Sequence, residues 1–130
     1  MPTLFHEKVL TAGVNQASIT HYSDPAFDRM LGEAEKYLVE VVATNVIGET
    51  ALLTVTLETS NDGVTWFLRG TLIDAVDVLG GAVRWGAEPW NTGDTDCPPM
   101  NGCYARFGCT LTGMGPYGNL ELYVEGRDGA

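Results

Sequence analysis

The residues that could do acid–base or nucleophilic chemistry are few and follow no catalytic spacing. The chain has two histidines, His6 and His21, and three cysteines, Cys97, Cys103 and Cys109. A serine nucleophile elbow, a zinc-binding H-E-x-x-H helix and a phosphate-binding P-loop each require a fixed local pattern, and none occurs. A pair formed by His21 and Cys97 would act as base and nucleophile only if the fold joined them. The sequence therefore predicts no enzyme and no catalytic residue.

The cysteines and the loop around them raise the question of metal binding. The spacing of Cys97, Cys103 and Cys109 fits neither a zinc knuckle nor a C-x-x-C redox site. We expect reduced thiols that fill apolar space, with a Cys97–Cys103 disulfide or metal binding as alternatives. Asp94 and Asp96 could hold Ca²⁺ together with backbone carbonyls, although loop acids mostly serve solvation. We predict no metal site.

Gly113 and Gly115 resemble the start of a dinucleotide-binding loop. Such a loop lies between a strand and a helix, whereas these glycines join two predicted strands. A turn is the expected structure, and no cofactor is predicted.

Exposed aromatic side chains are the strongest candidates for binding. Trp85 and Trp90 flank the start of a long predicted loop at 86–102. They either cap one end of the domain or anchor a partner subunit or a sugar ring, since Trp and Tyr are favoured at interface hot spots. Tyr104 and Tyr117 are candidate interface residues of the same kind.

Composition and charge narrow the class of partner. A chain of 130 residues with a net charge of −10 is long enough for one domain with its own core. The acidic excess disfavours nucleic acid and anionic membrane surfaces, which need clustered lysine and arginine, and it suits docking onto a basic or mixed surface. No apolar stretch reaches the roughly 20 residues that span a bilayer, and the N-terminus has no signal-peptide pattern.

The clearest local structure is a hairpin over 51–72. Apolar and polar residues alternate at 53–58, which is typical of a half-buried strand. A tight-turn signal follows at 61–63, and a return strand is predicted to begin at Val64. Trp66 is in phase with Leu68, so we expect it in the core.

Further strands extend the same pattern. We predict one strand at 36–44 and a second hairpin formed by 104–112 and 119–125 around a turn at 113–118. Weaker strand signals lie at 7–10, 16–20 and 82–85. A cap and proline at 23–25 predict at most one short helix.

These elements predict an all-β fold, an antiparallel β-sandwich or jelly roll of about seven or eight strands. Residues 36–130 would form the sandwich core. Residues 1–35 would form an N-terminal arm or edge strands of the same single domain.

Two segments of the chain resemble a known class of viral proteins. Residues 53–66 run from an alternating strand through Ser60-Asn61-Asp62-Gly63 to a tryptophan. Residues 104–127 contain a Tyr-x-Arg strand, a Gly-x-Gly-Pro turn and a closing strand that ends in Gly-Arg. In order and spacing, residues 36–127 are similar to small structural proteins of tailed bacteriophages.

This resemblance implies a virion β-sandwich, most simply a head decoration (cement) protein that binds the major capsid protein and self-associates, with a trimer favoured. It implies assembly in the host cytoplasm and location in the virion. A head–tail or tail accessory protein is one alternative. A carbohydrate-binding module is another, because the Ser-Asn-Asp-Gly turn before tryptophan also occurs in such modules.

Overall fold

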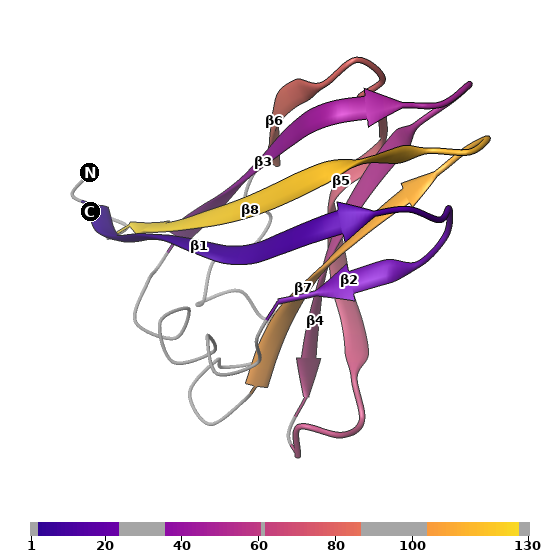
Figure 1. Cartoon of the computed structure of the whole chain (residues 1–130). Coiled ribbons are helices and arrows are strands. Elements are labelled where there is room, and N and C mark those ends of the chain that lie inside the picture. The colour runs from indigo at the N-terminus through magenta and orange to yellow at the C-terminus, as the bar shows by residue number, and fades with distance from the viewer. Residues whose placement is uncertain (1–2, 24–35, 61, 87–103, 128–130) are drawn as a thin grey trace.

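Eight β-strands form two four-stranded sheets in the computed structural model, which describes residues 3–23, 36–60, 62–86 and 104–127 (Figure 1). The strands are β1 Thr3–Val14, β2 Thr20–Tyr22, β3 Lys36–Ile47, β4 Leu52–Ser60, β5 Phe67–Asp77, β6 Ala82–Gly86, β7 Tyr104–Thr112 and β8 Tyr117–Arg127. The strand order is β1-β8-β3-β6 in one sheet and β2-β7-β4-β5 in the other, and all neighbours are antiparallel. This confirms the predicted antiparallel sandwich. No described residue is helical, and the predicted short helix falls on residues outside the described ranges apart from Ser23.

The pairing follows a simple nested rule. β1 pairs with β8, β2 with β7, β3 with β6 and β4 with β5, as in one long antiparallel hairpin. Rolling this hairpin up brings β8 against β3 and β7 against β4, which completes both sheets. The result is the strand order of an eight-stranded jelly roll.

The second predicted hairpin is wrong in its pairing. Both segments are strands, but β7 lies in one sheet and β8 in the other. Their apolar stripes, which include Phe107 and Leu122, are fully buried as predicted. The stripes face each other across the core instead of lying side by side, because alternation identifies a buried face but not a hydrogen-bonded neighbour.

The first predicted hairpin is confirmed, with a wider turn. β4 and β5 pair from Leu52↔Asp77 to Thr59↔Phe67, so the return strand begins at Phe67 instead of Val64. The first two strands of the chain, β1 and β2, each lie at one edge of their sheet.

The core lies between the two inner faces. The first sheet contributes valine, alanine and leucine side chains from β1, β3 and β8. The second sheet contributes apolar side chains from β4, β5 and β7. The largest fully buried side chains are Phe107, Leu53, Leu57, Leu111, Leu120, Leu122, Val39, Val41, Val46 and Val55.

Cys109 is one of these core residues, and its thiol is buried and free. Burial raises the pKa of the Cys109 thiol to about 12, since the charged thiolate is poorly solvated there. The expectation of an apolar filler is confirmed for Cys109, whereas Cys97 and Cys103 lie outside the described residues.

The Cys109 thiol should therefore resist alkylation in the folded protein. With iodoacetamide at mildly alkaline pH, the peptide that contains Cys109 should stay unmodified in native protein and react fully in denaturant. Peptide mass spectrometry measures both states. Rapid native labelling at Cys109 would show that this strand opens readily.

Four of the connections between the sheets, those that lie wholly within the described residues (15–19, 48–51, 78–81 and 113–116), are at one end of the sandwich, which we call the closed end (Figure 1). Backbone hydrogen bonds join these connections, from Glu49 N–H to the Met114 carbonyl (3.0 Å) and from Val78 N–H to the Ala51 carbonyl (3.1 Å). The Met114 N–H also donates to Thr50 Oγ1 at 2.7 Å. The two sheets diverge away from this end.

Candidate functional site

Exposed aromatic and apolar side chains gather at the opposite end of the second sheet, near the β4–β5 turn. Tyr22 and Tyr104 are each 41% exposed and Leu68 is 62% exposed. Tyr22 ends β2, Tyr104 begins β7 and Leu68 lies in β5. Three strands and the turn therefore contribute to one surface.

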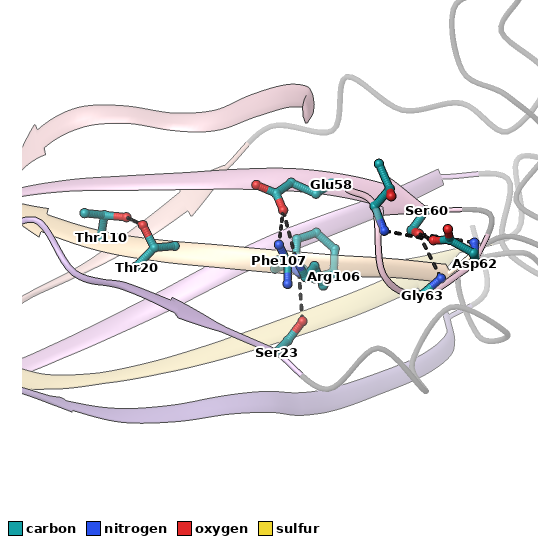
Figure 2. Close-up of polar contacts among 10 residues, drawn as sticks. Thr20, Ser23, Glu58, Ser60, Asp62, Gly63, Arg106, Phe107 and Thr110 are labelled. Carbon is teal, nitrogen blue, oxygen red and sulfur yellow. Dashed lines mark hydrogen bonds and ion pairs between the residues drawn. The ribbon is translucent and has the colours of Figure 1, made fainter. Parts of the chain in front are cut away.

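Arg106 is the centre of this surface. Its guanidinium lies 3.7 Å from the ring centroid of Tyr22 and 4.1 Å from that of Trp66. Its Nε donates to Glu58 Oε1 at 2.8 Å, and a second guanidinium nitrogen lies 2.7 Å from the same oxygen (Figure 2). The planar guanidinium thus combines ring stacking with a charge-assisted hydrogen bond. We call Tyr22, Glu58, Trp66 and Arg106 the aromatic–arginine cluster.

Strand register brings this cluster together. Glu58 of β4 is paired with Arg106 of β7 on one side and with Leu68 of β5 on the other. Directly paired residues share a face, so these three side chains form a row on the outer face of the sheet. Tyr22 is paired with Gly108 next to this row, where a Cβ would come within 3.1 Å of the Tyr22 ring. The absence of a side chain at Gly108 therefore leaves room for the Tyr22 ring.

The β4–β5 turn beside the cluster is held by its own side chains. Ser60 Oγ donates to Asp62 Oδ1 (2.9 Å) and accepts from Gly63 N–H (2.9 Å) (Figure 2). Asp62 Oδ1 also accepts from the N–H groups of Val64 and Thr65, both at 2.8 Å. These contacts fix the backbone that leads into Trp66.

The same hydrogen bonds from Thr65, Val64 and Ser60 lower the pKa of Asp62 below its usual 3.8. A lowered pKa stabilises the fold above the unfolded value and loses that effect as the pH falls through the folded value. We therefore expect Asp62→Ala to reduce the free energy of unfolding at neutral pH, and the difference from wild type to shrink below pH 3.8.

Urea denaturation across this pH range measures that difference, with Asp74→Ala, an exposed acid of β5, as the control. An NMR titration of Asp62 should give a midpoint below 3.8. A midpoint at or above that value would contradict the hydrogen-bonding account.

Removal of the Arg106 side chain should lower the free energy of unfolding. Arg106→Ala leaves Glu58, whose side chain is only 18% exposed, without its cation. We expect a loss of about 2–3 kcal/mol in unfolding free energy, because a half-buried charge loses its partner. Arg106→Lys should lose less, since it keeps the charge but not the planar group that stacks.

A double-mutant cycle with Arg106→Ala and Glu58→Gln measures the interaction energy between the two side chains. The loss in the double variant should be clearly smaller than the sum of the two single losses in urea denaturation. Additive losses would mean that the two side chains act independently.

Of the four predicted interface residues, Tyr104 lies at this surface. Its ring packs beside the turn, within 3.6 Å of the position that a Cβ on Gly63 would occupy. Tyr117 begins β8 at the closed end and is 51% exposed, so the structure separates it from Tyr104. Trp85 lies in β6 opposite Glu40, and its side chain is outside the described set, as is all of Trp90.

Tyr22 and Arg106 were not predicted as site residues, and the core position predicted for Trp66 is wrong. Trp66 is half-buried against Arg106 on the outer face and is not in the core. The prediction failed because it took Leu68, with which Trp66 is in phase, to face the core, whereas Leu68 is 62% exposed on the outer face. The phase that places Arg106 outward was visible in the alternation of 104–112.

His21 is paired with Cys109, but the raised thiol pKa of about 12 leaves that sulfur protonated at neutral pH. No group of three or more His, Cys, Asp or Glu in the described ranges lies close enough to hold a metal ion. Those ranges also contain no helix with the length and apolar character needed to cross a membrane.

Comparison with known proteins gives no relative. The chain matches no protein-family model, no curated protein and no solved structure at a significant level.

Proposed function

We propose that this chain is a non-enzymatic structural protein of a virion, a decoration protein that stabilises a phage head by binding the capsid. The observation that carries the proposal is the aromatic–arginine cluster, which presents Trp, Tyr and Arg side chains on a rigid sheet. These residue types dominate the binding energy of protein interfaces. Their mutual contacts keep them in place before binding, so little side-chain entropy is lost on docking.

Two further observations support the proposal. Jelly rolls are a common architecture of viral capsid domains, although the fold alone is shared with lectins and other proteins. The motif order over residues 36–127 resembles that of phage structural proteins. Sugar binding is less favoured at the cluster, because one ring face of both Tyr22 and Trp66 is already used by Arg106.

The proposal is tested by cosedimentation with capsids assembled from the major capsid protein encoded nearest to this chain. The protein should pellet with capsids at a fixed stoichiometry, and the decorated capsids should withstand higher temperature than bare ones. Each contact with the capsid can be weak, because many copies of the protein bind to one capsid lattice. Absence from capsids, together with binding to purified tails, would replace the decoration role by a head–tail or tail role.

A further inference from the structure

The surface around the β4–β5 turn has an apolar centre whose own charges cancel. We define the turn patch as the aromatic–arginine cluster together with Leu68 and Tyr104. Leu68 and Tyr104 are 62% and 41% exposed, and each is paired in register with β4, at Glu58 and Ser60. The guanidinium of Arg106 is neutralised by Glu58 at 2.7 Å. A partner protein that docks here therefore contacts apolar and aromatic atoms, and it need not supply a counter-charge for Arg106, which is already paired with Glu58.

An exposed carboxylate lies beside this centre. Asp62 is exposed at the adjoining turn, and its carboxylate is kept in the ionised form by the backbone N–H groups that it accepts. The whole chain carries a net charge of −10. A second copy would bring the same acidic turn and the same net charge to the interface, and like charges brought together oppose association.

We propose that the turn patch docks onto a different protein whose surface is apolar at its centre and carries lysine or arginine side chains around it. This inference rests on the proposed function, in which that surface belongs to the capsid. Complementary charge around an apolar centre accelerates encounter and fixes orientation, while the buried aromatic and arginine residues supply affinity.

A second group of exposed apolar side chains provides a matched control. Ile47, Met114 and Tyr117 lie at the closed end and are 62%, 64% and 51% exposed. Met114 lines a shallow hollow together with Gly48, Glu49 and Gly115, at the opposite end of the sandwich from the turn patch. No arginine is stacked there among the described side chains. Leu68 and Ile47 are equally exposed at 62%, so the same change at each should affect folding similarly.

The first experiment uses a synthetic peptide of alternating leucine and lysine, with a leucine–glutamate peptide and a serine–lysine peptide as controls. NMR should show the leucine–lysine peptide shifting the Trp66 indole and the amides of Leu68 and Tyr104, but not those of Ile47 and Met114. Leu68→Ser should weaken binding at least tenfold, and Ile47→Ser less than twofold. Added salt should weaken binding as it screens the charges.

Equal shifts at both ends, or an equal response to the leucine–glutamate peptide, would overturn the inference. So would sedimentation velocity that shows the chain self-associating through a contact that Leu68→Ser abolishes, since the occupant would then be a second copy.

The second experiment repeats the capsid cosedimentation with the same variants. Loss of pelleting with Leu68→Ser but not with Ile47→Ser supports the turn patch as the docking surface. Wild-type pelleting that neither variant changes would overturn this inference and leave the decoration role standing. Failure of the wild type to pellet, with the peptide result intact, would instead remove the decoration role alone.

Discussion

Gly113→Ala should lower the free energy of unfolding by about 3–5 kcal/mol, among the largest effects of any single substitution in this chain. Gly113 has φ +128°, and a Cβ at this position would lie 2.4 Å from the Thr50 carbonyl oxygen and 2.5 Å from Thr50 Oγ1. That hydroxyl also accepts the hydrogen bond from Met114 N–H. The new methyl group would therefore separate two of the four connections at the closed end.

Gly115→Ala is the control in the same turn. Gly115 also has a positive φ, +62°, but no atom lies within 4 Å of its Cβ position. Its replacement should cost only the backbone penalty of about 1–2 kcal/mol. Thermal and urea denaturation of the two variants measures the difference, and equal losses would show that the contact with Thr50 carries no strain.

Phe107→Ala should destabilise the protein by a similar amount, about 3–5 kcal/mol. Phe107 is fully buried, and its backbone is bonded twice to Ser23. Ser23 N–H donates to the Phe107 carbonyl at 2.9 Å, and Phe107 N–H donates to Ser23 Oγ at 2.8 Å, the latter drawn in Figure 2. This strand cannot shift easily to fill the space, so the variant would keep a cavity between the sheets.

Phe67→Ala makes the same chemical change at a position that is 53% exposed. The loss there should be about 1 kcal/mol or less, because much of the ring is already in water. Urea midpoints of the two variants compare them directly. A loss at Phe67 as large as that at Phe107 would indicate that the core extends beyond the two inner faces.

Most strands of this chain could be predicted from its sequence, but of their pairing only the β4–β5 hairpin could. The alternation at 53–58 predicted β4 because each buried apolar side chain is followed by an outward polar one. The same reasoning predicted β7 and β8 but joined them in a hairpin. Burial depends on residue type and phase, whereas the choice of neighbour depends on the whole set of strands.

The candidate site likewise combines a residue that local sequence predicts with residues that only strand pairing brings together. Tyr104 was predicted as an interface residue from its type, and the structure places it at the turn patch. Arg106 was not predicted, since its importance depends on Glu58, Tyr22 and Trp66, which come from three other segments of the chain. Long-range register creates this site, and no local pattern encodes it. Trp85 and Trp90 remain predictions.

The nested pairing also constrains how the chain reaches its native state as it leaves the ribosome. Among the six strand pairs of the described sheets, only β4–β5 joins strands that are consecutive in sequence. Of the described strands, β1 is synthesised first and β8 last, and β1 can join its sheet only when β8, its partner, is present. Contacts of such long sequence separation slow folding and leave strand edges exposed during synthesis. A nascent chain stalled before β8 should therefore hold little beyond the β4–β5 hairpin, and the first sheet should form only once β8 has emerged from the ribosome.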